Sequence, residues 1–302
     1  MKNIFITGAT SFIGVNLIRE LYKKNNIVAI IRKNSKNKYL LEEFKDIKII
    51  ELNMDEIDLL PNYIDIKCDI FYHLAWNGTR GESRQDSTLQ EENYINSIKA
   101  LKIAKKLNCK TFISAGSQAE YGNHNNIITE TTRELPNTQY GIYKLKFYRY
   151  MRTYCKRNNI IYIEPRFFSL YGIGDYEKTL VISTIDKMLN NEEIDLTECI
   201  QIWNFLNIKD AIKALTLLQE TTNSGVYNFG NNISKELKYY IDIIYKVTKT
   251  KSKLNYGVVP YPKTGIVNIN PSITKLQKEI NWQPEISFEK GIEEIIEKRK
   301  DI

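Results

Sequence analysis

Tyr140 and Lys144 stand four residues apart, a spacing that places both side chains on one face of a helix. A phenol has a pKa of about 10 in water, and a neighbouring ammonium favours its ionised form. Ser117 supplies a hydroxyl that can stabilise negative charge on the same substrate oxygen. Together these groups suit acid/base chemistry coupled to hydride transfer between a nicotinamide and a carbon bearing oxygen. The chain holds 20 tyrosines, so a surface helix pair formed by chance is the alternative.

A glycine-marked turn at residues 8–14 directly follows the first apolar segment. Gly8 allows a sharp turn, and Gly14 allows a helix to pack closely against a strand. The N-terminus of that helix offers unpaired N–H groups and a positive dipole end to a pyrophosphate. Ser11 stands where the usual spacing has its middle glycine. The position between a strand and an amphipathic helix predicts a dinucleotide site, with a plain left-handed turn as the alternative.

The cofactor preference depends on Arg32, which follows the second predicted strand. An acidic residue there would bind the adenosine 2′-hydroxyl, but no carboxylate occurs before Glu42. Because a guanidinium suits a 2′-phosphate, the sequence favours NADP(H) over NAD(H). The alternative is that Arg32 and Lys33 are two solvated basic residues at a strand end.

Short β-branched segments alternate with longer amphipathic ones from residue 2 to about 165. This alternation predicts an α/β fold with a doubly wound parallel sheet of the Rossmann type, with ligands beyond the carboxyl ends of the strands. Prolines and glycines break the pattern afterwards and predict a smaller C-terminal substrate-binding lobe. We expect residues 1–165, with about 201–229, to form the dinucleotide-binding domain, and residues 166–200 and 230–302 to form the lobe. Strands are predicted at 2–7, 27–31, 47–52, 69–74, 110–114 and 160–164, and helices at 12–24, 87–107 and 139–158.

Composition describes an ordinary globular protein of 302 residues, with 42% hydrophobic and 26% charged residues. The net charge of +7 is spread among asparagines and isoleucines and lacks an aromatic–basic platform, so no nucleic-acid partner is expected. The four cysteines show no CxxC spacing, which predicts reduced thiols, no metal site and a cytoplasmic location. No apolar run has the length of a signal peptide or a membrane span, so no membrane partner is expected.

Further segments extend the pattern over nearly the whole chain: His73-Leu74-Ala75, Ser117–Gly122, Pro165–Gly172, Val226–Gly230 and Asn281–Pro284. With the turn and the Tyr140/Lys144 pair, they resemble the extended short-chain dehydrogenase/reductase family. That family contains NAD(P)-dependent nucleotide-sugar epimerases, dehydratases and ketoreductases. The resemblance implies Tyr140 as acid/base, Lys144 as its partner, Ser117 as substrate hydrogen-bond donor, and a homodimer formed through helices 87–107 and 139–158. The expected cofactor contacts are Gly8, Thr10, Ser11, Phe12, Ile13, Gly14, Arg32, Asn53, Leu74, Ala75, Asn93, Tyr140, Lys144, Phe167 and Ser169.

The residues after Ser117 distinguish the activities of that family. In the dehydratases of the family that this chain resembles, Asp-Glu stands where this chain has Gln118 and Ala119. Neither the Gln118 nor the Ala119 side chain can exchange protons. Decarboxylases and 3,5-epimerases have Glu or Cys at the position of Ala119. Glu120 is a candidate substitute acid, but it is displaced by one residue. Two chemistries remain, reduction at C4 of a nucleotide-activated (deoxy)hexose for surface polysaccharides, and 4-epimerisation on a tightly bound NAD. Arg32 favours the 4-ketoreductase, because it favours NADP(H), whereas the epimerase would hold NAD. A non-catalytic NADP(H)-binding sensor is the third alternative.

The substrate site departs from the family pattern. Trp203 stands where relatives often have an arginine for the nucleotide phosphates, so Arg166, Lys178 or Lys263 would have to supply the cation. Trp203 itself can stack on a base or sugar, or belong to the core. Trp76 replaces a small residue, and His73 is interpreted as structural. The expected substrate contacts are Thr79, Arg80, Gln118, Arg166 and Trp203.

Overall fold

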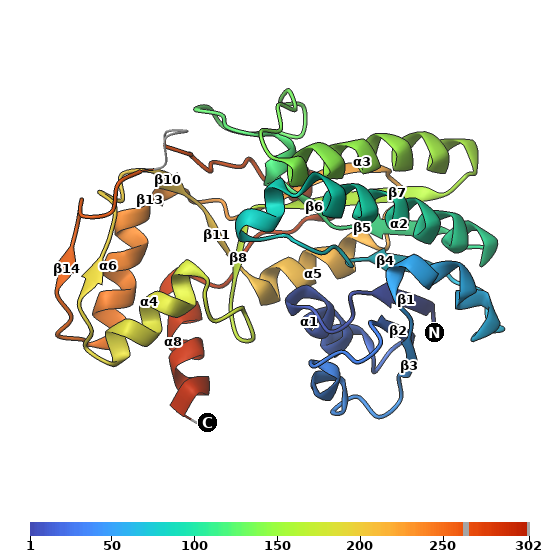
Figure 1. Cartoon of the computed structure of the whole chain (residues 1–302), viewed down its shortest axis with the longest axis horizontal. Coiled ribbons are helices and arrows are strands. Elements are labelled where there is room, and N and C mark those ends of the chain that lie inside the picture. Colours follow the sequence, from blue (N-terminus) through green and yellow to red (C-terminus); the bar gives the residue numbers. More distant parts are fainter. Residues whose placement is uncertain (262–265, 301–302) are drawn as a thin grey trace. The chain divides into compact units, whose positions relative to one another are not determined.

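The computed structural model describes residues 1–261 and 266–300, and the chain divides into two compact units (Figure 1). The first comprises Met1–Gly122, Thr132–Phe167 and Ile212–Tyr227, and the second comprises Asn123–Thr131, Phe168–Ala211 and Asn228–Ile302. Residues 201–211 therefore belong to the second unit, whereas the sequence placed them in the first domain. The reason is strand pairing, because two short strands of this segment pair with strands at 169–171 and 235–236.

The first unit is built on one mostly parallel sheet with the strand order β12-β7-β5-β4-β1-β2-β3, and β6 pairs with β7. The order changes direction between β1 and β4, so the carboxyl ends of these two strands leave room for a ligand. The predicted doubly wound sheet is confirmed. The strands are β1 (Asn3–Thr7), β2 (Asn26–Ile31), β3 (Lys48–Glu51), β4 (Ile70–His73), β5 (Thr111–Ser114), β6 (Gly116–Ser117), β7 (Ile161–Phe167) and β12 (Gly225–Phe229).

Helices cover both faces of this sheet. The long helices α2 (Ser87–Lys106) and α3 (Gln139–Arg157) lie side by side on one face, and α1 (Phe12–Leu21) and α5 (Ile208–Leu218) lie on the other (Figure 1). The rings of Phe5, Phe71 and Phe112 stack beneath them across three neighbouring strands. Helix α1 ends three residues before its predicted end, because the Asn25 side chain donates to the Leu21 carbonyl and a polar run follows. Short 3₁₀ segments that the sequence did not predict are η1 (Lys38–Leu41), η2 (Met54–Asn62), η3 (Gly81–Gln85) and η4 (Gln118–Glu120).

In the part of the second unit that the structure describes, four helices combine with short strand pairs. The helices are α4 (Leu180–Leu189), α6 (Leu237–Thr248), α7 (Thr274–Ile280) and α8 (Phe288–Lys300). The strand pairs are β8 (Ser169–Tyr171) with β11 (Phe205–Asn207), β9 (Ile194–Asp195) with β14 (Leu254–Asn255), and β10 (Ile202–Trp203) with β13 (Lys235–Glu236). The aromatic rings of Tyr171, Phe205, Tyr240 and Phe288 pack together at its centre.

All four cysteines are buried and free. Within the described ranges, no helix combines the length and the apolar character needed to cross a bilayer.

Candidate functional site

In the turn after β1, backbone segments pack closely against one another. Gly8 has a φ of +69°, and a Cβ atom there would lie 2.8 Å from the Ala75 amide nitrogen. A Cβ at Gly14 would lie 2.4 Å from the Gly8 carbonyl oxygen. Ser11 caps helix α1 by accepting a hydrogen bond from the Gly14 amide (3.1 Å), which leaves other first-turn N–H groups without a partner in the helix. The turn therefore forms a side-chain-free cradle of N–H groups at a helix N-terminus, and it fits a pyrophosphate.

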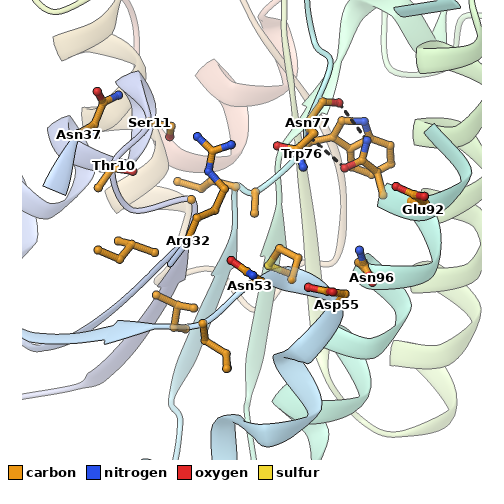
Figure 2. Close-up of a pocket in the computed structure, with 18 of the residues that line it drawn as sticks. Thr10, Ser11, Arg32, Asn37, Asn53, Asp55, Trp76, Asn77, Glu92 and Asn96 are labelled. Carbon is orange, nitrogen blue, oxygen red and sulfur yellow. Dashed lines mark hydrogen bonds between the residues drawn. The ribbon is translucent and has the colours of Figure 1, made fainter. Parts of the chain in front are cut away.

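A pocket of about 600 Å³ opens beside this turn (Figure 2), which is a volume typical of ligand sites. Its wall comes from the ends of β1, β2, β3 and β4 and from one face of α2. It contains part of the predicted cofactor set, namely Gly8, Thr10, Ser11, Arg32, Asn53, Leu74, Ala75 and Asn93. The sequence reading missed the polar wall residues Asn37, Asp55, Asn77, Glu92 and Asn96. Their positions in the sequence, close to the predicted strand ends or beside Asn93 on its helix, could have identified them as wall residues.

Arg32 differs from Lys33 and Lys38 in its partners. Lys33 pairs with Glu56 and Lys38 pairs with Glu51, each at 2.6 Å. Arg32 has no ion-pair partner within residues 1–261 and 266–300, and its side chain extends into the pocket (Figure 2). The pocket wall thus carries one guanidinium whose charge is available to a ligand.

His73 is a structural residue at the end of β4. Its Nδ1 lies 2.9 Å from the Thr7 hydroxyl, and its Nε2 lies 2.8 Å from the Ser97 hydroxyl. Ser97 donates to the Asn93 carbonyl, so it accepts from His73, and Nδ1 accepts from Thr7. Burial, together with the charge of Lys144, lowers the pKa of His73 to about 3, which keeps it neutral. His73 thus holds β1, β4 and α2 in register beneath the pocket.

Tyr140 and Ser117 meet where α3 approaches η4. Gly141 permits this approach, because a Cβ there would lie 2.3 Å from the Ala119 carbonyl oxygen. The Ser117 hydroxyl accepts from the Ala119 amide (3.2 Å), which leaves its own hydrogen available as a donor. Burial raises the pKa of Tyr140, and the Ser117 hydroxyl and the Arg84 charge both oppose that effect. Gly141, directly after the tyrosine, is a residue that the sequence reading missed.

Lys144 lies buried on the same face of α3. Its ammonium donates to the Ala115 carbonyl (2.7 Å) and lies 3.8 Å from the centre of the Trp76 ring. Burial lowers the pKa of Lys144 to about 8, although the charges of Glu120 and Glu164 oppose this. Trp76 also packs edge-on against Tyr140 and lines the pocket, so it joins the pocket to the acid/base pair.

Arg166 is fully buried in a cluster of carboxylates in the first unit. Its guanidinium contacts Glu164 at 2.9 Å, Glu134 at 2.8 Å and Glu120 at 3.1 Å. These contacts argue against the expected role of Arg166 as a phosphate ligand, because its charge is already used inside the protein. Glu120 accepts from the Ser117 amide (2.7 Å) and has no exposed surface, so it is not a substitute acid for the substrate.

The remaining predicted residues are divided between the units. Thr79 and Arg80 lie on the loop between β4 and α2, Gln118 begins η4, and Phe167 ends β7. Ser169 and Trp203 belong to the second unit, where Trp203 packs against Phe205 and borders the aromatic core. Lys178 is exposed in that unit, and Lys263 lies outside the described residues.

The sheet order and the glycine turn define a nucleotide-binding α/β protein of the Rossmann type. Residues 4–230 match the model of the NAD dependent epimerase/dehydratase family, and the chain belongs to this family. It is accordingly an NAD(P)-dependent enzyme of the nucleotide-sugar epimerase/dehydratase class.

Individual relatives support this assignment. A CDP-abequose synthase from Salmonella muenchen is 28% identical over 98% of this chain and 97% of its own length. The structure of a UDP-N-acetylglucosamine 4-epimerase from Methanobrevibacter ruminantium M1, in complex with UDP-N-acetylmuramic acid, superposes with a TM-score of 0.91 at 24% identity, covering 99% of this chain and 98% of that one. A UDP-glucuronic acid 4-epimerase from Bacillus cereus, in complex with NAD, has a TM-score of 0.85 at 21% identity, covering 99% of both chains.

Proposed function

We propose that the protein is an NADP(H)-dependent 4-ketoreductase that acts at C4 of a nucleotide-activated deoxyhexose in surface-polysaccharide synthesis. The observation that carries the proposal is the composition of the acid/base cluster. Ser117, Tyr140 and Lys144 lie together, while the neighbouring positions offer only Gln118 and a buried Glu120 that faces inward. A site with one proton donor suits reduction of a ketone, whereas elimination of water needs a second acid or base. Similarity to a CDP-abequose synthase supports a nucleotide-activated sugar as substrate.

Each residue has a defined task in this mechanism. The nicotinamide cofactor, when bound, supplies the hydride for C4. The Ser117 hydroxyl donates a hydrogen bond to the C4 oxygen and stabilises the charge that develops there. Tyr140 gives that oxygen its phenolic proton, and the phenolate left behind is stabilised by the buried ammonium of Lys144. The Gly8–Gly14 cradle would hold the cofactor pyrophosphate, and the wall residues Asn53 and Asn93 would contact its remaining parts.

The preference for NADP(H) is supported by Arg32. Its guanidinium extends into the pocket and has no ionic partner in the described parts of the chain, so a 2′-phosphate would provide one. Two carboxylates, Asp55 and Glu92, also line the wall, and the position of the ribose relative to them decides how much of that attraction remains. Replacing Arg32 with glutamine should weaken NADPH binding, and NADH binding should change little. Equal losses for both cofactors would contradict the assignment.

The test of the function begins with the purified protein. Any bound cofactor is released and identified by mass, and absorbance at the reduced nicotinamide band is then followed with 4-keto-6-deoxyhexose nucleotides. Oxidation of added NADPH by one of them supports the ketoreductase. Tyr140→Phe should lower turnover by about 10³-fold, and Tyr143→Phe, one turn along the same helix, is the matched control. Near-normal turnover by Tyr140→Phe would refute the mechanism.

A 4-epimerase is the second candidate, because the two solved structures described above are 4-epimerases and the same three residues serve either reaction. Tightly retained NAD(H) and no net absorbance change would favour it. Cofactor binding without turnover of any nucleotide sugar would favour a sensor protein. We also propose a homodimer formed through α2 and α3, and, from the free cysteines, a cytoplasmic location.

A further inference from the structure

The loop between β4 and α2, residues 76–86, is held rigidly by two side chains of α2. Gln90 is fully buried and uses both ends of its amide. It accepts from the Trp76 indole N–H (2.7 Å) and donates to the Gly78 and Ser83 carbonyls (3.0 and 2.9 Å). Asn93 pairs with both backbone groups of Asn77, each at 2.9 Å. Few conformations satisfy all five bonds, so the loop is preorganised.

This loop carries Arg84 to the acid/base pair. The Gln85 side chain accepts from the Gln139 amide (3.2 Å), which ties the loop to the first turn of α3. The guanidinium carbon of Arg84 lies 4.7 Å from the centre of the Tyr140 ring, while the Lys144 ammonium lies 5.9 Å from the same centre. Arg84 also contacts the Thr79 carbonyl (3.4 Å), which steadies its side chain over the ring.

We propose that Arg84 is a positioning residue that acts on Tyr140 as a second cation and stabilises the phenolate left when the proton moves to the substrate oxygen. In that step the O–H bond of Tyr140 breaks, an O–H bond forms on the substrate, and negative charge remains on the phenol below the guanidinium. A cation over an aromatic face is attracted to the ring, and more strongly when the ring carries negative charge. The catalytic consequence rests on the proposed function, but the electrostatic interaction can be measured without turnover.

The arrangement of charges explains why a second cation is useful. Lys144 is directed toward the Ala115 carbonyl and the face of Trp76, and its own pKa is lowered by burial. Glu120 opposes ionisation of Tyr140, whereas the Ser117 hydroxyl and Arg84 favour it. Arg84 is the guanidinium among the groups that face the phenol, and arginine side chains in general remain cationic in proteins.

The test places 3,5-difluorotyrosine at position 140 of the full-length protein without cofactor and follows its ¹⁹F signal through a pH titration. The ring fluorines lower the intrinsic pKa of the phenol, so the transition falls where the protein is folded. In the Arg84→Gln variant, the pKa of this phenol should rise by about one pH unit. Arg84→Lys should restore most of the wild-type value. Lys23→Gln, which removes an exposed cation 5.7 Å from the Tyr22 ring, is the control and should leave it unchanged.

Two results would overturn the proposal. One is an identical titration in wild type and Arg84→Gln. The other is a shift in Arg84→Lys as large as that in Arg84→Gln, which would indicate packing instead of charge. Once a substrate is found, the pH dependence of turnover should move in the same direction in Arg84→Gln. If no nucleotide sugar is turned over, the proposed function fails, while the titration still decides the interaction.

Discussion

Replacing Glu164 with glutamine should make the stability of the protein less sensitive to pH. Glu164 is almost completely buried on β7, and burial together with the nearby Glu120 raises its pKa well above the ordinary value of 4.5. One guanidinium, that of Arg166, serves three carboxylates in this cluster, so it cannot fully offset the cost of a buried charge. Glutamine keeps an oxygen that can accept the 2.9 Å bond from Arg166 Nε, and it has no proton to lose.

The sign follows from linkage between protonation and folding. Because the folded-state pKa of Glu164 is raised, its contribution to stability is fully present below about pH 4.5 and is lost as pH rises toward the folded-state pKa. The free energy of unfolding of Glu164→Gln, relative to wild type, should therefore increase by about 1.4 kcal/mol for each pH unit in that window.

Urea unfolding at several pH values measures this difference, with equal m-values required for the comparison. Glu220→Gln is the control, because Glu220 forms an exposed ion pair with Lys2 at 2.7 Å and surface pairs contribute little. A constant offset between Glu164→Gln and wild type across the pH range would refute a protonated, buried Glu164. It would indicate that the carboxylate stays ionised against Arg166.

Three further predictions concern the cradle and the acid/base pair. Gly14→Ala should lower Tm by about 3 °C or more and weaken dinucleotide binding, because its Cβ would meet the Gly8 carbonyl, whereas Glu20→Ala on the exposed face of α1 should do neither. Gly141→Ala should reduce turnover more than cofactor affinity, because it pushes α3 away from η4 and separates Tyr140 from Ser117; equal effects on both would contradict this. Reductive turnover should fall as pH rises through about 8, where Lys144 loses its charge, and a flat profile to about pH 10 would count against a required ammonium.

The amino-acid sequence by itself determined the features that depend on neighbouring residues. The alternation of β-branched and longer amphipathic segments predicted α2, α3, β1 to β5 and β7, which form within a few residues of their predicted bounds. Gly8, Ser11 and Gly14 specify the cradle because turn geometry and helix capping act over a single turn of the chain. The four-residue spacing of Tyr140 and Lys144 likewise places both on one face of α3.

Tertiary structure decided which of these residues are free to meet a ligand. The sequence suggested that Arg166 and Glu120 could act on the substrate. In the fold, β7, η4 and the segment of Glu134 bring them together as a buried ion-pair cluster. Their charges therefore compensate each other inside the protein and do not bind substrate. The sequence did not single out Arg84, and only the attachment of its loop by Gln90 places it over Tyr140. Residues 201–211 belong to the second unit, and not to the first domain as predicted, because their strands pair with segments about 35 residues away in either direction along the chain. Local sequence carries no signal for such pairings, because their energy arises from contacts between distant segments that only the folded chain brings together.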